Sequence, residues 1–143
     1  MKRAILIHGW EGSPNRGWIP WLKNELESRG FHVEALSMPN PAHPKMAEWV
    51  HSLENEAPDK ETILVGHSLG CITILRYLEH TSVQVAGAVF VAGFSDNLGY
   101  SELKSFFSSP IDWEKARQNC RRFVAINSDD DPFVPLKHGE IFK

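Results

Sequence analysis

The chain has 143 residues, of which 42% are hydrophobic and 23% are charged, and its formal net charge is −3. This composition excludes a disordered tail, a coiled coil and a fibrous protein, and the charge gives no reason to expect nucleic-acid binding. The apolar runs are too short to span a bilayer, and residues 1–10 are too short for a secretory signal. Two cysteines, Cys71 and Cys120, cannot form a disulfide framework. We therefore expect one domain over residues 1–143, in the cytoplasm, without a membrane partner.

Short β-type runs alternate with helical patterns along the chain. Buried apolar runs predict strands at residues 3–8, 31–36, 61–65, 83–92 and 123–126. Apolar residues three and four apart predict helices at 18–29, 46–53 and 69–79, and the last of these is apolar nearly all round. Residues 93–121 hold two short, irregular helical patterns, and a further helix is predicted from Pro135 onward. The alternation predicts an α/β fold with a parallel sheet and helices on both faces.

The segment from Gly66 to Gly70 matches the pattern G-x-S-x-G, with Ser68 at its centre. A buried strand precedes it and an apolar helix follows, which is the context that a nucleophile elbow needs. A sharp strand-to-helix turn of this kind exposes the serine hydroxyl at the carboxyl edge of the sheet. Ser68 is therefore the candidate nucleophile. The alternative is a tight, glycine-rich turn without chemistry.

Two backbone amides are candidates for an oxyanion hole. Leu69 supplies the first, because the residue after the nucleophile commonly donates its N–H to the oxyanion. The first predicted strand ends in His8-Gly9-Trp10, and the Trp10 N–H is the second candidate. The alternative for His8 and Gly9 is ordinary turn chemistry. Glu11 beside this loop raises the further hypothesis of a cationic substrate.

Three aspartates, Asp129 to Asp131, follow the fifth predicted strand. A carboxylate there can orient an imidazole and stabilise its charged form. Asp131 is the best candidate because Pro132 and Pro135 stiffen the loop after it. A divalent metal on the cluster is a weak alternative, since no ligand spacing supports it.

The general base is harder to find. In this arrangement a histidine follows the acid in the chain. His138 is the histidine that follows Asp131. Because it falls in the helix that has just begun, we expect it to point away from Ser68 and to lie on the surface.

Five motifs in chain order resemble those of the α/β-hydrolase superfamily, in particular its small serine hydrolase branch of the YdeN type. They are His8-Gly9-Trp10, Trp18-Ile19-Pro20-Trp21-Leu22, Met38-Pro39-Asn40-Pro41, Gly66-His67-Ser68-Leu69-Gly70-Cys71 and Ser128-Asp129-Asp130-Asp131-Pro132. The resemblance implies a three-layer sandwich with strand order 2-1-3-4-5. It also implies Ser68 as nucleophile, Asp131 as triad acid, and Trp10 and Leu69 as oxyanion donors. The expected substrate is a small acyl ester or amide, and no cofactor is expected.

The family has a further strand and a final helix, with the triad histidine in the loop between them. We therefore expect this chain to be incomplete at its C-terminus, with the last strand and the histidine-bearing segment missing. Residues 123–126 would then form an exposed apolar edge strand, so we predict weak stability or a dimer paired across that edge. A catalytically impaired, hydrolase-like protein-binding module is the alternative function.

Two further hypotheses concern the surroundings of Ser68. Several aromatic side chains are candidates for an apolar acyl pocket: Phe94, Tyr100, Phe106, Phe107 and Trp113. Residues 12–17 have the G-x-x-x-x-G spacing of a phosphate-binding loop, but Trp18 stands where such a loop needs lysine. A nucleotide site is therefore not favoured.

Overall fold

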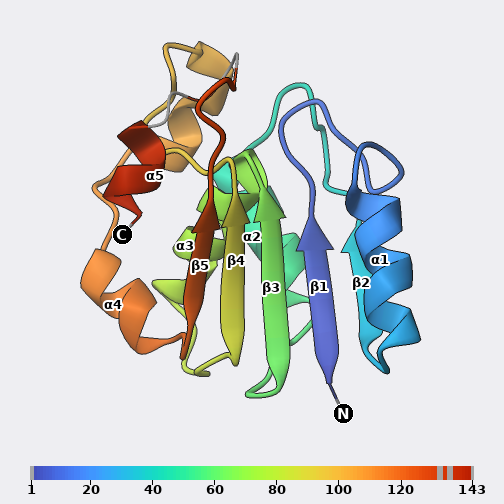
Figure 1. Ribbon diagram of the computed structural model, residues 1–143. Helices are drawn as coiled ribbons and strands as arrows, with labels where there is room; N and C mark the ends of the chain where they lie inside the picture. The colour runs from blue at the N-terminus through green and yellow to red at the C-terminus, as the bar shows by residue number, and fades with distance from the viewer. Residues whose placement is uncertain (1, 132–133, 135–136, 143) are drawn as a thin grey trace.

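The protein was analysed as a computed structural model that describes residues 2–131, 134 and 137–142. Five parallel strands form one sheet in the order β2-β1-β3-β4-β5 (Figure 1). The strands are β1 (Arg3–Ile7), β2 (His32–Leu36), β3 (Thr62–His67), β4 (Gly87–Val91) and β5 (Phe123–Ile126). The predicted fold class and strand order are confirmed. The sheet order reverses direction beside β1, so the carboxyl ends of β1 and β3 flank the crevice where ligands bind in such sheets.

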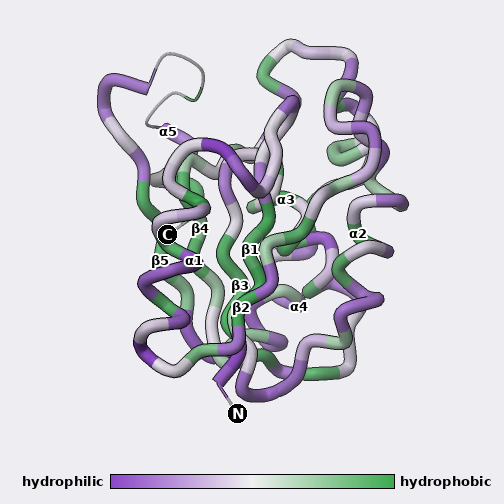
Figure 2. The backbone as a smooth tube through the Cα atoms, turned by 90° about the vertical axis from the view of Figure 1, so that its right-hand side faces the viewer, coloured by the Kyte–Doolittle hydropathy of each residue, from purple (hydrophilic) through white to green (hydrophobic). Residues whose placement is uncertain are grey.

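Helices cover both faces of the sheet. Helix α1 (Ile19–Ser28) packs on the face that carries Ala4, Leu6 and Val65. Helices α2 (Met46–Glu54) and α3 (Leu69–Leu78) pack on the opposite face, against Ile5 and Leu64 among others. The hydropathy of the chain follows this layering, since the strands form the apolar centre (Figure 2). Alternate side chains of each buried strand therefore enter two separate cores.

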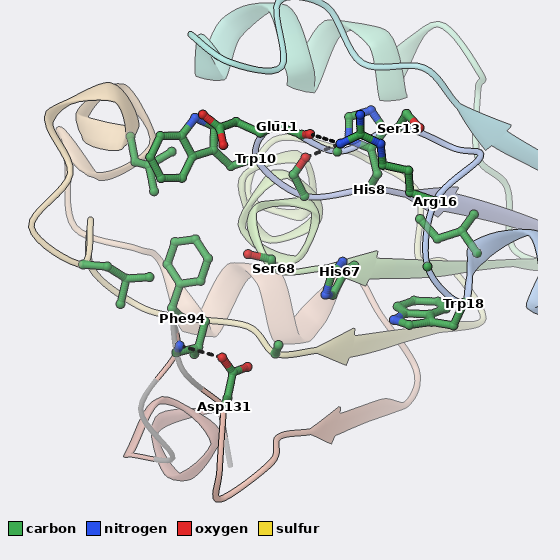
Figure 3. Close-up of a pocket in the computed structure, with 18 of the residues that line it drawn as sticks. His8, Trp10, Glu11, Ser13, Arg16, Trp18, His67, Ser68, Phe94 and Asp131 are labelled. Atoms are coloured by element: carbon green, nitrogen blue, oxygen red, sulfur yellow. Dashed lines mark hydrogen bonds between the residues drawn. The ribbon is translucent and has the colours of Figure 1, made fainter.

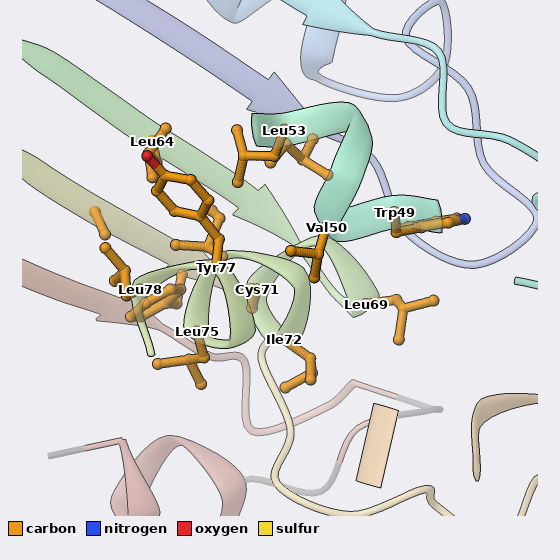
Figure 4. Packing of buried hydrophobic residues seen from close by; sticks show 14 of the residues in the cluster. Trp49, Val50, Leu53, Leu64, Leu69, Cys71, Ile72, Leu75, Tyr77 and Leu78 are labelled. Carbon is orange, nitrogen blue, oxygen red and sulfur yellow. The ribbon is translucent and has the colours of Figure 1, made fainter. Parts of the chain in front are cut away.

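Helix α3 is the centre of the larger core. All of its residues are buried, because β3, α2 and α4 (Trp113–Gln118) surround it. Figure 4 shows its side chains beside those of Val50 and Leu53 from α2. Trp49 and Leu53 of α2 meet it with fully buried side chains. The prediction that residues 69–79 form a deeply buried helix is confirmed. This burial holds the start of α3, and therefore Ser68, in a fixed position relative to the sheet.

The fourth and fifth strands differ in how well they were predicted. The fourth is shorter than the predicted 83–92, because Val85 makes only an isolated bridge to Cys120 before β4 begins at Gly87. The fifth lies where it was predicted, and its side chains are exposed: Phe123 by 36%, Val124 by 51% and Ile126 by 53%. Val124 and Ile126 pair with Val89 and Val91 of β4 and lie on the same sheet face as them. Neither Val124 nor Ile126 belongs to the core that α1 covers on this face. The apolar edge strand is confirmed, and its pairing with another chain stays a prediction.

The segment after β4 crosses above the carboxyl edge of the sheet. It holds the 3₁₀ helix η1 (Ser101–Phe107) and α4, and so the two short helical patterns expected in 93–121 are confirmed. Helix α5 (Lys137–Ile141) follows β5, and the predicted start at Pro135 lies outside the described residues. None of the helices in the described part of the chain is long and apolar enough to cross a membrane.

Candidate active site

Ser68 occupies the turn between β3 and α3, as the motif predicts. Its backbone has φ +56° and ψ −115°, a combination that residues with a side chain rarely adopt. Such a conformation costs about 1–3 kcal/mol, and it persists only where the surroundings enforce it. The Ser68 N–H donates to the Val91 carbonyl at 2.8 Å, and the Ser68 carbonyl accepts from the Cys71 N–H at 3.0 Å. The strained serine is therefore tied to both β4 and α3.

The elbow also depends on a glycine that lets α3 approach β1. A Cβ atom on Gly70 would lie 2.9 Å from the Ile7 carbonyl carbon and closer still to its oxygen, and 3.0 Å from the His8 oxygen. These neighbours are backbone atoms, which cannot move without shifting the strand. The absence of a side chain at Gly70 is therefore what allows the helix to begin directly above the end of β1.

The loop after β1 lies against Ser68. A Cβ atom on Gly9 would be 2.9 Å from the Ser68 Cβ and 3.5 Å from its Oγ, so Gly9 is in direct contact with the candidate nucleophile. Trp10 follows Gly9 and, like Gly9 and Ser68, lines a cavity that is described below. Its indole N–H donates to the Ala42 carbonyl at 3.0 Å. Leu69 is the first residue of α3, so its N–H has no acceptor within the helix. Both predicted oxyanion donors therefore belong to segments that adjoin Ser68.

The buried side chain of His8 holds this loop in place. Its Nε2 accepts the Met38 N–H at 3.0 Å and its Nδ1 lies 2.8 Å from the Gly9 carbonyl oxygen, so the neutral form with the proton on Nδ1 satisfies both contacts. The ring is buried against Trp49, and burial lowers the pKa of the imidazole. His8 thus joins the ends of β1 and β2, which is a more specific role than turn chemistry.

One cavity of about 620 Å³ brings the predicted site residues together (Figure 3). Ser68, Trp10 and Asp131 all line it, whereas the Leu69 side chain is buried in the core and only its backbone faces the elbow. Of the predicted aromatic residues, Phe94 and Tyr100 line the cavity. The prediction is wrong for the other three: Phe106 is fully buried, and Phe107 and Trp113 line other hollows. The sequence analysis missed the rest of the apolar lining, which consists of Trp18, Ile19, Ala92, Leu98, Leu103 and Val134.

Asp131 is the member of the aspartate cluster that reaches the cavity. Its Oδ1 accepts the Val134 N–H at 3.0 Å, which holds the carboxylate at the end of the loop after β5. Asp129 and Asp130 are exposed. Pro132 and Pro135, whose stiffening of this loop was predicted, lie outside the described residues. In the part of the chain that is described, no group of three or more His, Cys, Asp or Glu residues could hold a metal ion.

His67 and His138 have different surroundings. His67 lines the cavity and packs edge-on against Trp18; burial lowers the pKa of its imidazole, and the nearby Asp131 charge opposes that shift. His138 is buried, and its Nδ1 accepts the Ser95 N–H at 3.0 Å. The predicted surface position of His138 is therefore wrong, because α5 folds back onto the loop after β4. Within residues 2–131, 134 and 137–142, no histidine nitrogen forms a hydrogen bond with the Ser68 hydroxyl.

The buried histidines predict a pH dependence of stability. Burial lowers the folded-state pKa of His8, His67 and His138 from the ordinary 6.5. Above that pH the groups are neutral in both states, and below it the unfolded chain binds protons first. The free energy of unfolding should therefore fall as the pH drops through about 6.5, by up to ~1.4 kcal/mol per pH unit for each histidine.

Urea unfolding followed by tryptophan fluorescence across this pH range checks the prediction. His138→Gln should flatten the pH dependence, and His51→Gln, at a 70% exposed position on α2, is the surface control. Equal pH dependence in the His138→Gln variant and the parent chain would contradict the assignment.

Comparison with known proteins agrees with this geometry. A family model described as "Serine hydrolase" matches residues 4–142. The chain is 37% identical to YdeN of Bacillus subtilis over 97% of this chain and 76% of the relative. It is 34% identical to the serine hydrolase RBBP9 of Rattus norvegicus over 96% of this chain and 76% of that protein. The chain belongs to the serine hydrolase family.

Solved structures show that this serine hydrolase has the α/β-hydrolase fold. The crystal structure of the ydeN gene product from B. subtilis superposes with a TM-score of 0.92, covering 99% of this chain and 78% of that chain at 34% identity. Est1E from Butyrivibrio proteoclasticus, solved with ferulic acid, superposes with a TM-score of 0.81 at 12% identity, and this likeness shows the fold alone. The α/β-hydrolase resemblance inferred from the sequence motifs is therefore confirmed.

Proposed function

We propose that this serine hydrolase cleaves a small acyl ester or amide, with Ser68 as its nucleophile. The observation that carries the proposal is the strained Ser68 backbone at the start of α3, in contact with Gly9 and facing a cavity of about 620 Å³. In the proposed reaction the Ser68 Oγ attacks the acyl carbonyl and gives its proton to a general base. The scissile C–O or C–N bond then breaks, so the alcohol or amine leaves with that proton and the acyl group remains as an ester on Ser68. Water then releases the acid and restores the hydroxyl.

The remaining roles follow from what surrounds Ser68. The Trp10 and Leu69 N–H groups would stabilise the negative charge that develops on the carbonyl oxygen, an effect worth about 3–4 kcal/mol per donor in related sites. Asp131, held by the Val134 amide, would orient a histidine and stabilise its charged form. The histidine that accepts the Ser68 proton rests on the family resemblance alone.

A hydrolase-like binding module is the second candidate. It is favoured by one observation, that no histidine in the described ranges forms a hydrogen bond with the Ser68 hydroxyl. Such a module would keep the cavity for a small molecule or use another surface for a protein partner. The two candidates differ in whether Ser68 is chemically reactive.

Labelling with a fluorophosphonate probe separates the two functions. We expect the folded chain to gain one covalent label by intact-mass spectrometry, and Ser68→Ala to gain none. The oxyanion donors and the positioning of the probe still accelerate the reaction where the base is weak, so slow labelling also supports the enzyme.

Ser95→Ala is the matched control, because among the described residues the Ser95 hydroxyl is the serine hydroxyl that contacts a histidine ring, with its Oγ 3.2 Å from His138 Nδ1. This variant should label like the parent. No label on a chain with an intact near-ultraviolet circular dichroism spectrum would support the binding module instead.

A further inference from the structure

The cavity around Ser68 has two chemically different sides. On one side of the serine lie Trp10 and Phe94, which belong to an apolar wall (Figure 3). On the other side lie Ser13, Arg16 and Trp18, from the loop that leads into α1 (Figure 3). A molecule whose scissile carbonyl sits at Ser68 therefore meets an apolar wall in one direction. In the other direction it meets the Arg16 guanidinium together with the side chains of Trp18 and Ile19.

Arg16 has unused hydrogen-bonding capacity on this polar side. Its Nη1 donates to the backbone carbonyl of Glu11 at 3.2 Å, and among the described residues it forms no ion pair with a carboxylate. Arg3, Arg29, Arg76 and Arg117 each lie within 3.6 Å of a glutamate oxygen. Arg121 and Arg122 also form no ion pair among the described residues, but neither lines the cavity. A guanidinium carries five N–H donors in a fixed fork, so Arg16 can still bind a carboxylate through two parallel hydrogen bonds.

The loop that carries Arg16 is held in place. The Glu11 N–H donates to the Pro41 carbonyl at 2.8 Å, and the Arg16 N–H donates to the Ser13 carbonyl at 3.4 Å. The Arg16–Glu11 contact then ties the side chain to the loop's own backbone. Part of the entropy of ordering a long side chain is therefore lost before any ligand arrives, which favours binding.

We propose that Arg16 selects substrates that carry a carboxylate, so that the substrate class is the half-esters, or the corresponding amides, of dicarboxylic acids. This inference rests on the proposed function, because it places the scissile carbonyl at Ser68. The apolar remainder of the substrate lies against Trp10 and Phe94, and the free carboxylate lies on the Arg16 side. It is the opposite of the hypothesis that Glu11 favours a cation. Glu11 lines the same cavity and presents its backbone carbonyl to Arg16, so the test below compares both signs of charge.

Two acidic residues, Glu11 and Asp131, also line the cavity. Asp131 comes from the loop after β5 and lies beyond His67 as seen from Arg16 (Figure 3). Its charge acts on His67, which is one of the residues that separate it from the loop of Arg16. A carboxylate bound at Arg16 is therefore directed away from Asp131.

Binding to the Ser68→Ala chain tests the proposal without turnover. Titration calorimetry would compare monoethyl adipate, the neutral diethyl adipate and the cationic ethyl 6-aminohexanoate. We expect the anionic ester to bind about tenfold more tightly than the neutral one, which is the range for one charge-assisted contact at a partly open site. Added sodium chloride should reduce this difference, because the contact is screened.

Arg16→Gln in the same background should remove the preference, and Arg16→Lys should keep part of it because the charge remains without the fork. Arg29→Gln is the matched control, since Arg29 is an exposed arginine directly after α1 and outside the cavity lining. Equal binding of the anionic and neutral esters, tighter binding of the cationic ester, or an unchanged preference in Arg16→Gln would each overturn the proposal. The binding measurement needs no reactive serine, so it is independent of the labelling experiment. If Ser68 is not labelled but binding still depends on Arg16, the proposed nucleophile is refuted and the proposed carboxylate site is supported.

Discussion

Gly70→Ala is expected to destabilise the protein by more than about 3 kcal/mol and to abolish labelling of Ser68. The new Cβ would overlap the backbone of Ile7 and lie 3.0 Å from the His8 oxygen. Relief requires α3 to move away from β1, and that movement would separate Ser68 from the loop that carries Gly9 and Trp10. Small domains are stable by only about 5–15 kcal/mol, so the loss is a large fraction of the total.

Urea unfolding and fluorophosphonate labelling together measure this effect. Gly87→Ala is the matched control, because a Cβ at that position in β4 would meet the Arg122 carbonyl oxygen at an ordinary 3.5 Å. It should change the free energy of unfolding little and leave labelling intact. A Gly70→Ala chain with the stability and labelling of the Gly87→Ala chain would refute the close-approach argument.

Arg76→Met is expected to cost about 3–5 kcal/mol of stability, because it leaves a buried glutamate without its counter-charge. Arg76 is 2% exposed and donates to the Glu79 carboxylate at 2.9 Å and 3.2 Å. It also donates to the carbonyls of Phe106 and Pro110, and Glu79 accepts the Asp112 N–H at 3.1 Å. The buried Arg76–Glu79 pair therefore attaches the segment that holds η1 and α4 to α3.

The exposed pair on α4 provides the comparison. Arg117 and Glu114 lie 2.6 Å apart but are 71% and 64% exposed, so Arg117→Met should cost at most about 1 kcal/mol. Combining Arg76→Met with Glu79→Leu should recover part of the loss, since no unpaired charge then remains buried. Faster amide hydrogen exchange across residues 101–118 in Arg76→Met would report the release of the segment. Similar costs for Arg76→Met and Arg117→Met would show that the buried pair does not hold it.

Much of the fold could be predicted because its signals are local. The runs Ile5-Leu6-Ile7 and Ile63-Leu64-Val65 are too apolar for half-exposed strands, which predicts a parallel sheet covered on both faces. The elbow was recognisable for the same reason, since a strand, a glycine, a serine and a helix follow one another within a few residues. The fourth strand was predicted too long because apolar residues before Gly87 look like strand but pair only at Val85.

The candidate site was predicted less completely, because it assembles from segments far apart in the chain. His138 has no sequence signal of burial; it is buried because α5 places its ring against Ser95 and Phe94, which come from the loop after β4. Phe94 and Phe106 look alike in sequence, yet one lines the cavity and the other fills the core beside Trp49. The unpaired Arg16 could have been noticed as the one cation in its loop, but nothing local shows which way the loop faces.

The sequence by itself determined the order of strands and helices along the chain and the position of Ser68 in its strained turn. Both depend on steric limits that act between residues close together in the chain. Only the tertiary structure decided which side chains share the cavity with Ser68. That outcome depends on how α3, η1 and the loops after β1, β4 and β5 pack together. Packing between segments far apart in the chain cannot be recognised from the sequence of any one segment.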